Sequence, residues 1–332
     1  MSSQELPTKF EELSEEELSK MTIRRATGEK RLVRCTPGGI LLPYAFVKLA
    51  RGFHDFQFRS GDVVVSTFPK SGTVWMGEIL WAMTHFDRLA AMDTSAINGR
   101  SYFFDLDFLH PSSSSDYSPL IAAFQEKCPG GQVDEGIMLQ LANADEGRRV
   151  IKTHLQFSFF NDSLLSKSKV VYVARNPKDA CVSLHYFLSQ KLDTVVEGGF
   201  PATAETFMKN GMTFAPYWGH LQQAWKLKDH PNVHFVFYED LKADVMAELG
   251  KLNGFLGLDL KEDQLEKVAE ATSFENMRKR DLEKPLTKME GSFFRKGVVG
   301  DWKNLATPEL DAQMDRWIAE NSKDMGIQFR YS

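Results

Sequence analysis

Residues 62–80 read DVVVSTFPKSGTVWMGEIL, and this stretch decides the fold. The run Asp62–Phe68 is rich in β-branched residues, follows Gly61 and is stopped by Pro69, so it predicts a buried strand. A helical pattern over 73–85 follows after a short loop. At such a junction the backbone N–H groups converge on the N-terminus of the helix, where the helix dipole favours negative charge.

The loop 69–73, PKSGT, therefore predicts an anion site. Lys70 adds a positive charge, and Ser71 and Thr73 add hydroxyl donors. Gly72 permits a close approach of the backbone, so a phosphate or a sulfate is the expected guest. The nucleotide-triphosphate pattern GxxxxGK[ST] is absent, because here the lysine precedes the glycine. A plain turn with a helix cap is the alternative that this motif alone leaves open.

Strands alternate with helices along the chain, which is typical of right-handed βαβ units. Further strands are predicted at 149–155, 169–174 and 232–238, and further helices at 178–190, 214–228, 243–256 and 261–272. We expect a single α/β domain over 1–332, with a central, mainly parallel sheet flanked by helices and a P-loop-like strand–loop–helix. Residues 1–35 are expected to form an N-terminal arm. Residues 101–147, which contain SSSS and CPGGQ, are expected to form a long loop or insertion.

The composition limits the partners of the protein. Lys and Arg number 40 against 45 Asp and Glu, a net charge of −5, which disfavours a nucleic-acid or membrane-surface binder. Cys35, Cys128 and Cys181 are widely separated and form no CxxC pair, so neither a disulfide framework nor a zinc ribbon is expected. The N-terminus is polar and acidic, and no run approaches the ~18 apolar residues of a membrane span. These features predict a cytoplasmic protein.

Two other stretches carry basic residues where a ligand could bind. Arg175 follows the predicted strand 169–174, and open α/β sheets place ligands at the carboxyl ends of their strands. Ser183 lies on the first turns of the helix that begins after it. In 291–304, GSFFRKGVVGDWKN, Arg295 and Lys296 stand between glycines, as in a mobile loop that closes over an anion. An exposed basic turn is the alternative for each.

The stretch 151–155, IKTHL, contributes a candidate base. Strand alternation places Lys152 and His154 on one face and Thr153 on the other. A histidine near a strand end is a candidate general base because its pKa lies near neutrality, although a structural role is the commoner one. No HExxH or HxH spacing appears, so no metal site is predicted.

Together these stretches resemble the cytosolic sulfotransferases, which use PAPS (3′-phosphoadenosine 5′-phosphosulfate). The matching blocks are TFPKSGTVW (67–75), RVIKTHL (149–155), VVYVARNPKDACVS (170–183), FVFYEDLK (235–242), TSFENM (272–277) and FRKGVVGDWK (294–303). They follow the order of the family over most of the chain. The stretch 101–147 is long compared with vertebrate members, and invertebrate relatives carry such variations, so an invertebrate member is expected.

The resemblance implies a role for each matching residue. Loop 70–73 would hold the 5′-phosphosulfate, Arg175 and the 295–297 loop the 3′-phosphate, and Trp75 and Phe274 the adenine. The cofactor residues would be Lys70, Ser71, Gly72, Thr73, Val74, Trp75, Arg175, Ser183, Tyr238, Thr272, Phe274, Phe294, Arg295, Lys296 and Gly297. The catalytic residues would be His154 as general base, with Lys70, Lys152 and Ser183. The transfer would be in line, without a covalent enzyme intermediate and without a required metal.

The acceptor implied by the resemblance is a small, largely apolar phenol, catecholamine, sterol, other alcohol or amine. Its pocket would be lined by Phe103, Phe104, Phe108, Phe157, Phe159 and Phe187, with 101–147 as a lid. Phe103 and Phe187 match positions that the family uses for this purpose, so they rank first.

Two positions depart from the family pattern. Val74 stands where a second Thr is common, which removes one hydroxyl donor to the 5′-phosphate and is expected to weaken cofactor binding. The dimer motif KxxxTVxxxE would begin at Lys303, where Thr307 fits but Pro308 and Ala312 replace Val and Glu. A homodimer is therefore in doubt, and a monomer is an equal expectation.

Three other functions stay open. A relative of insect retinol dehydratase would sulfonate its acceptor and then eliminate the sulfate. An atypical nucleotide kinase would need magnesium and ATP, but GxxxxGK is missing. A non-catalytic nucleotide-binding scaffold would have no use for His154 beside the phosphate loop.

Overall fold

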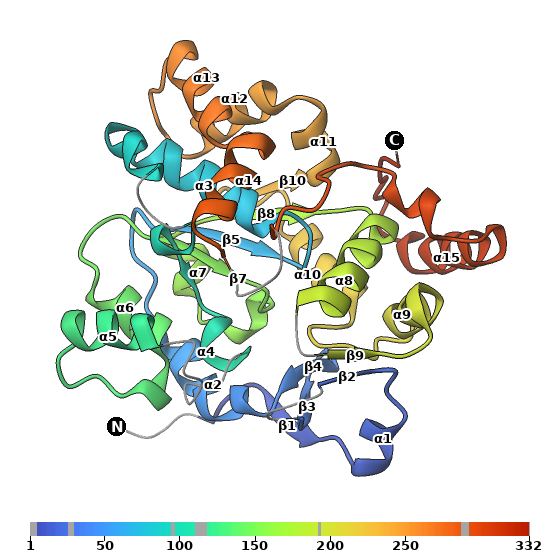
Figure 1. Cartoon of the computed structure of the whole chain (residues 1–332). Coiled ribbons are helices and arrows are strands. Elements are labelled where there is room, and N and C mark those ends of the chain that lie inside the picture. The colour runs from blue at the N-terminus through green and yellow to red at the C-terminus, as the bar shows by residue number, and fades with distance from the viewer. Residues whose placement is uncertain are drawn as a thin grey trace.

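A computed structural model describes residues 5–25, 30–93, 97–109, 118–191, 194–286 and 292–331 (Figure 1). Among them, five strands form a parallel central sheet. In spatial order the strands are β10 (Val233–Phe237), β8 (Lys169–Ala174), β5 (Val63–Thr67), β7 (Val150–Thr153) and β6 (Tyr102–Phe103). The predicted α/β class and the mainly parallel sheet are therefore confirmed. The carboxyl ends of β5, β7 and β8 lie at one edge of the sheet because these strands are parallel neighbours.

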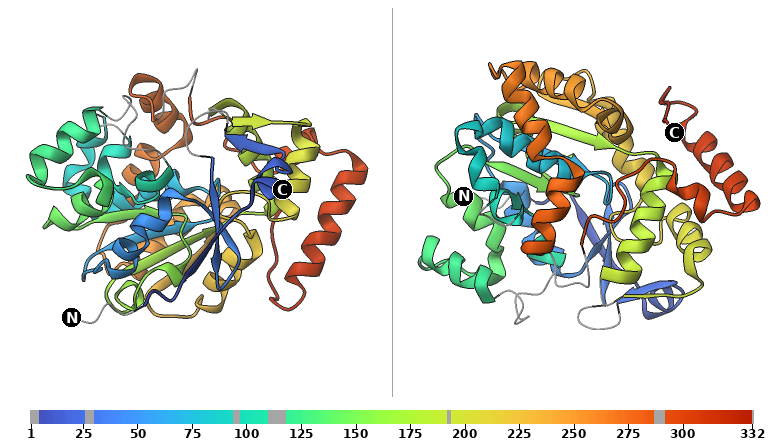
Figure 2. Two further views of the ribbon diagram at one scale, coloured as in Figure 1. Left: turned by 90° about the horizontal axis from the view of Figure 1, so that it is seen from below. Right: turned by 45° about the horizontal axis from the view of Figure 1, so that its top comes forward.

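Helices cover both faces of this sheet (Figure 1). Along β5, Val63 and Val65 pack into a core with α3 and α12, while Val64 packs into the core on the opposite face. The helices are α1 (Glu15–Ser19), α2 (Ala45–Asp55), α3 (Thr73–Thr84), α4 (Leu106–Leu109), α5 (Ser118–Lys127), α6 (Ile137–Ala144), α7 (Ser163–Lys167), α8 (Pro177–Lys191), α9 (Gly199–Met208), α10 (Tyr217–Lys226), α11 (Tyr238–Ala243), α12 (Val245–Phe255), α13 (Glu262–Ala271), α14 (Phe274–Glu283) and α15 (Pro308–Ser322). Short 3₁₀ helices are Phe86–Met92, Ile97–Arg100, Val133–Glu135, Phe157–Phe159 and Asp301–Asn304. Figure 2 shows α15 at the periphery in both views.

Two small sheets involve the N-terminal segment. The strands β1 (Lys9–Glu12), β3 (Leu32–Thr36) and β4 (Ile40–Pro43) form one antiparallel sheet, and β2 (Ile23–Arg25) pairs with β9 (Thr194–Val196) in another. Val33 is 1% exposed and Cys35 is fully buried. This part of the N-terminal segment thus packs into the core of the protein, because Val33 and Cys35 alternate along β3 towards it.

The stretch 101–147 is not the long loop that its composition suggested. Where it is described, it contains β6, α4, α5 and α6, and its residues 110–117 lie outside the described part. Helix α6 begins where Asp107 accepts hydrogen bonds from the backbone N–H groups of Met138 (2.8 Å) and Leu139 (3.1 Å). This cap comes from 31 and 32 residues earlier in the chain, so a local pattern does not reveal it.

Two predicted boundaries differ from the observed ones, each for a reason that the structure shows. Strand β7 ends at Thr153 because the N–H of His154 donates to the side chain of Asp105 and not to a neighbouring strand. Helix α10 begins at Tyr217 and not at Phe214, whose φ of +70° lies outside the right-handed helical region. Strand β8 has the predicted bounds.

No helix of the described ranges is long and apolar enough to cross a bilayer. Within the same ranges, no cluster of His, Cys, Asp and Glu side chains is arranged as a metal site. All three cysteines are free.

Candidate active site at the carboxyl edge of the sheet

The loop between β5 and α3 has the backbone of a close-approach site. Gly72 has φ of +108° and Lys70 has φ of +67°. A Cβ atom at Gly72 would lie 2.9 Å from Cδ2 of Tyr238, so only glycine fits here. Ser71 is 1% exposed, and the hydroxyls of Thr67 and Thr73 lie 2.7 Å apart. The loop is therefore a tight, preformed turn whose N–H groups precede α3.

Three buried donors around this loop have no hydrogen-bond partner in the described part of the chain. They are Ser71 Oγ, Trp75 Nε1 and Arg175 Nε. Buried donors of this kind are costly unless something satisfies them, and each can donate to an acceptor atom. The residues present thus fit a ligand that is rich in anionic oxygens.

Arg175 joins the phosphate loop to the C-terminal basic loop. It follows β8 directly, and its guanidinium donates from Nη1 to the carbonyl of Lys70 (3.0 Å) and from Nη2 to the carbonyl of Val298 (3.3 Å). The guanidinium carbon lies 4.4 Å from the centre of the Tyr238 ring. The hydroxyl of Tyr217 donates to the carbonyl of Arg175 (2.6 Å). Arg175, at the end of β8, thereby brings loop 69–73 and the C-terminal loop with Arg295 and Lys296 together.

In the C-terminal loop, the two predicted cations, Arg295 and Lys296, both pair with one carboxylate. Asp301, 4% exposed, pairs with Arg295 (2.6 Å) and Lys296 (2.7 Å). Although its burial opposes the shift, the hydrogen bonds from Lys296 and Arg295 lower the pKa of Asp301 to about 2. Gly297 has φ of +62°, and a Cβ there would lie 2.4 Å from the Phe274 ring. The loop therefore lies directly against Phe274.

Several aromatic rings gather beside the phosphate loop. The rings of Trp75 and Tyr238 are edge to face at 5.7 Å. Lys242 Nζ lies 6.0 Å from the Trp75 ring and 5.9 Å from the Phe274 ring, so both rings border the same region. Phe294 packs edge-on against Phe274.

Three other residues of the predicted site lie on helices or at their ends. Thr272 is fully buried, and its hydroxyl donates to the carbonyl of Val268 at the end of α13. Ser183 is half-buried on α8. Val74 occupies the first turn of α3 and is also half-buried.

His154 has one defined tautomer. Its Nδ1 lies 2.9 Å from the carbonyl oxygen of Thr67, and a carbonyl can only accept, so Nδ1 carries the hydrogen. Burial lowers the pKa of the imidazole to about 3, and Lys70 and Lys152 contribute to the shift. The ring is thus neutral at physiological pH, and its Nε2 keeps a lone pair.

Lys152 and Phe103 lie beside His154. The Phe103 ring is edge to face with the His154 ring at 5.4 Å, and Lys152 Nζ lies 5.7 Å from the Phe103 ring. Burial lowers the pKa of Lys152 to about 8, although the carboxylate of Glu78 opposes the shift. A Cβ at Gly77 would lie 2.8 Å from Lys152 Cδ, so this glycine leaves room for the lysine. Lys152 and His154 therefore share one face, as predicted from alternation.

The Lys70 ammonium lies between two aromatic rings. Its Nζ is 4.3 Å from the centre of the Phe187 ring and 4.0 Å from that of Phe293. Cation–π contacts of this kind attract an ammonium to the faces of aromatic rings. Phe187 comes from α8 and Phe293 from the C-terminal loop, so two distant segments meet at this lysine.

Of the other predicted acceptor residues, Phe104, Phe108 and Phe159 are buried in the core, whereas Phe157 is half-buried. Phe104 and Phe108 are 0% and 1% exposed and pack with Phe53. Phe159 packs against Phe46, and Phe157 against Tyr172. Within the described ranges, Phe103 and Phe187 are the predicted phenylalanines whose rings contact His154 or Lys70.

Comparison with known families agrees with this arrangement. The model of the family described as "Sulfotransferase domain" matches residues 60–326. The chain belongs to the cytosolic sulfotransferase family. It is 29% identical to Sulfotransferase 1E1 of Homo sapiens over 302 residues, which are 88% of this chain and 94% of that protein. It is 31% identical to Sulfotransferase 1A1 of Rattus norvegicus over 300 residues, which cover 88% and 95%.

Two solved structures extend the comparison. Retinol dehydratase in a complex with retinol and PAP, the desulfated form of the cofactor, has a TM-score of 0.82 and 25% identity, with 98% of this chain and 99% of that chain covered. Mouse sulfotransferase SULT7A1 complexed with PAP has a TM-score of 0.64 and 25% identity, with 86% and 94% covered. The protein is a PAPS-dependent sulfotransferase that acts on small-molecule acceptors.

Several residues of the sulfotransferase site were not predicted from the sequence. They are Thr67, Asp105, Phe214, His220, Phe293 and Asp301. Phe293 and Asp301 lie in a stretch that was singled out for two cations between glycines with flanking Phe and Trp, but neither residue was itself assigned to the site. Asp105 and His220 contact His154 from 49 and 66 residues away, and no local pattern marks them.

Proposed function

We propose that this sulfotransferase transfers the sulfuryl group of PAPS to a hydroxyl or amine of a small, largely apolar acceptor, with His154 as general base. The tautomer of His154 carries the proposal. Because Nδ1–H is committed to the carbonyl of Thr67, the unprotonated Nε2 is the atom that can receive a proton. Thr67 is also the last residue of β5, so the base is anchored at the start of the phosphate loop.

The cofactor supplies an activated sulfuryl group when it is bound. Loop 70–73 offers backbone N–H groups and hydroxyls to its 5′-phosphosulfate, and Lys70 offers positive charge near the reacting centre. Lys152, whose pKa is lowered to about 8, is the second cation beside His154. These side chains supply the positive charge that such a transfer requires, so we propose that the enzyme needs no metal.

For the 3′-phosphate and the adenine we propose the residues that the family resemblance assigns. Arg175, Ser183 and loop 295–297 would hold the phosphate, and Trp75, Tyr238, Thr272, Phe274 and Phe294 would surround the adenine. The unsatisfied donors of Ser71, Trp75 and Arg175 support this assignment. Asp301 would share Arg295 and Lys296 with the phosphate, because it already pairs with both.

For the acceptor we propose a pocket walled by Phe103 and Phe187, with the segment 101–147 as its cover. The ring contacts of Phe103 with His154 and of Phe187 with Lys70 support these two walls. We further propose a cytoplasmic enzyme without nucleic-acid or membrane partners, in line with its family and its free cysteines.

A second candidate reaction is sulfonation followed by elimination, as in a retinol dehydratase. One observation favours it. The likeness to retinol dehydratase covers 98% of this chain with a TM-score of 0.82, whereas the likeness to mouse SULT7A1 covers 86% with a TM-score of 0.64. In this case the acceptor would be a long apolar alcohol, and the product would be an alkene.

Transfer of labelled sulfate from PAPS to a panel of phenols, catecholamines, sterols and retinoids tests the proposal. A labelled sulfate ester is expected for at least one acceptor, and turnover should persist in the presence of EDTA. Free labelled sulfate together with a dehydrated product would select the elimination reaction. Turnover that requires ATP and magnesium would instead select the kinase.

The matched variants are His154→Ala and His185→Ala. Loss of the base should lower turnover by about 10² to 10⁴, while the affinity for PAP stays within about threefold. His185, which contacts Thr203 on α9, is the control histidine, and its replacement should leave turnover unchanged. Normal rates in His154→Ala would refute the assignment of the base.

A further inference from the structure

Asp105 is a fully buried carboxylate that contacts the backbone of His154. It lies between β6 and α4 and is 0% exposed. Its Oδ2 accepts the backbone N–H of His154 (2.7 Å), and its Oδ1 accepts the hydroxyl of Thr153 (2.8 Å). Both partners are donors. An ionised carboxylate can accept from both at once, because each of its two oxygens is an acceptor.

The backbone carbonyl of His154 also has a hydrogen-bond partner. His220 donates from Nε2 to the carbonyl of His154 (3.0 Å), because a carbonyl can only accept. The Nδ1 of His220 is then the acceptor for the hydroxyl of Tyr172 (2.8 Å). The backbone N–H of His154 therefore donates to Asp105 and its carbonyl accepts from His220, while its Nδ1 contacts both the carbonyl (2.9 Å) and the hydroxyl (3.1 Å) of Thr67.

We propose that Asp105 is a positioning residue that holds His154 so that Nε2 faces the acceptor. This inference rests on the proposed role of His154. Asp105 touches no reacting atom; it acts by fixing the peptide from which the imidazole extends, and Thr67 then fixes the ring. Small errors in the placement of a catalytic group cost large factors in rate, so this support matters to turnover.

Asp105 also links the base to the proposed acceptor wall. Phe103 pairs with Lys152 in the register of β6 and β7, and its ring lies against His154. Asp105 lies two residues after Phe103 and accepts hydrogen bonds from Thr153 and His154 at the end of β7. The acceptor wall and the base thus belong to one hydrogen-bonded unit, which keeps their relative position constant.

Asp107 is a matched control in the same segment. It is a half-buried carboxylate that accepts two backbone N–H groups, but these belong to Met138 and Leu139 of α6. Burial raises the pKa of Asp105 and of Asp107 to about 7, against the opposing effect of these hydrogen bonds. The two residues therefore share their electrostatics and differ in what they hold.

The first experiment observes the imidazole directly in the protein without ligands. Nuclear magnetic resonance of isotope-labelled imidazole nitrogens, with His154→Ala to assign the signal, should show the Nδ1–H form of His154 at neutral pH. Asp105→Ala should give a mixture of tautomers, because the peptide that carries the imidazole loses its hydrogen bond to the carboxylate. Asp105→Asn should change the signal less, because its amide oxygen can still accept from His154. Asp107→Asn should leave the signal unchanged.

The second experiment measures turnover with 4-nitrophenol as acceptor, together with calorimetric titration of PAP. We expect kcat to fall about tenfold in Asp105→Asn and on the order of a hundredfold in Asp105→Ala, with little change in the affinity for PAP. Asp107→Asn should lower kcat less than Asp105→Asn does, because Asp107 holds α6 and not His154. If Asp105→Ala does not fold, Asp105→Asn still decides the matter against Asp107→Asn.

The two experiments fail separately. A wild-type imidazole signal in both Asp105 variants, or an equal loss of kcat in the Asp107 variant, would overturn the positioning role. If the Asp105 variants change the imidazole signal but His154→Ala retains full turnover, the proposed base is wrong. The contact between Asp105 and His154 would still stand.

Discussion

Gly297 and Gly326 have the same backbone conformation, but only Gly297 lies against an aromatic ring of the candidate site. Their φ values are nearly the same, +62° and +61°. A Cβ at Gly297 would lie 2.4 Å from Phe274, whereas no described atom lies within 4 Å of a Cβ at Gly326. Gly297 must therefore be glycine for two reasons, its backbone conformation and the closeness of the aromatic ring.

This pair gives a prediction about cofactor binding. Alanine at either position should cost about 1–2 kcal/mol of stability, because each residue is left-handed. Only Gly297→Ala should also displace Phe274, and we expect its affinity for PAP to fall about tenfold or more. Thermal unfolding and calorimetric titration of PAP are the measurements. Equal affinities in the two variants would contradict the proposed contact of the loop with the adenine site.

At the scale of elements, Lys178 ties α8 to α15. Its side chain is 3% exposed and pairs with Asp311 and Asp315 of α15. Its Nζ also lies 4.1 Å from the centre of the Trp302 ring. The helix that carries Ser183 is thereby fastened to the C-terminal helix.

Removing this tie should lower the free energy of unfolding. We expect a loss of about 1.5–3 kcal/mol for Lys178→Met, because the buried lysine makes a charge-assisted hydrogen bond to Asp311 and lies against Trp302. Lys209→Met is the control: Lys209 and Glu205 form an exposed pair within α9, with side chains 72% and 57% exposed, and its loss should cost about 0.5 kcal/mol or less. Urea unfolding measures both. A loss for Lys178→Met no larger than for Lys209→Met would show that the tie contributes little.

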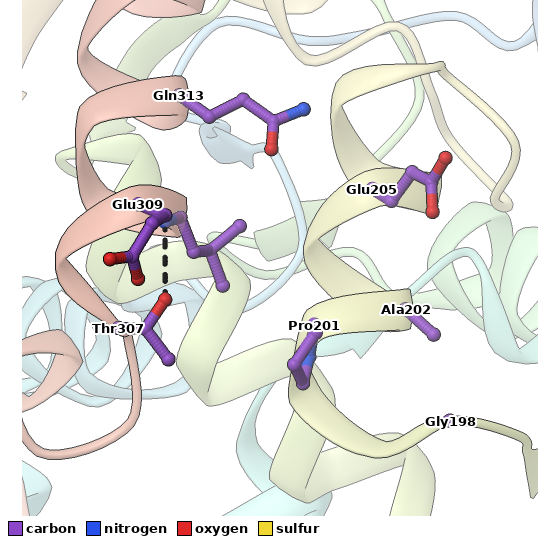
Figure 3. Close-up of a pocket in the computed structure, with 8 residues that line it drawn as sticks. Gly198, Pro201, Ala202, Glu205, Thr307, Glu309 and Gln313 are labelled. Carbon is purple, nitrogen blue, oxygen red and sulfur yellow. Dashed lines mark hydrogen bonds between the residues drawn. The ribbon is translucent and has the colours of Figure 1, made fainter.

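At the scale of the whole molecule, the residues at the degenerate dimer motif form the start of helix α15. The hydroxyl of Thr307 accepts from the N–H of Leu310 (3.3 Å) as the cap of α15, and Pro308 occupies the first turn. Thr307 and Pro308 are common at these two positions of helices. A groove between α9 and α15, lined by Glu205, Thr307, Glu309 and Gln313 among others, lies beside this helix start (Figure 3).

We therefore propose that the enzyme is a monomer. Light scattering should give the mass of one chain over a wide range of concentrations. The double variant Pro308→Val and Ala312→Glu, which restores the family pattern, tests whether the two replacements account for this state. A wild-type mass of two chains would refute the proposal.

Much of the fold followed from local patterns. The bounds of β8 were predicted without error, and β5, α3 and α13 within one residue at each end, because these elements carry dense apolar or periodic runs. The helices of 101–147 were missed because polar turn residues dominate that stretch, while Asp107 and buried contacts stabilise it from a distance. The cations of the candidate site were predicted, since each sits beside a strand end or a glycine.

By itself the sequence determined the α/β class, the phosphate loop, the family and the identity of the candidate base. Only the tertiary structure decided which nitrogen of His154 carries the hydrogen and what holds the residue in place. Those properties depend on Thr67 and Asp105, which are 87 and 49 residues away in the chain. Hydrogen bonds act over about 3 Å of space, whatever the separation in sequence, so these contacts exist only once the parallel sheet has brought the strand ends together.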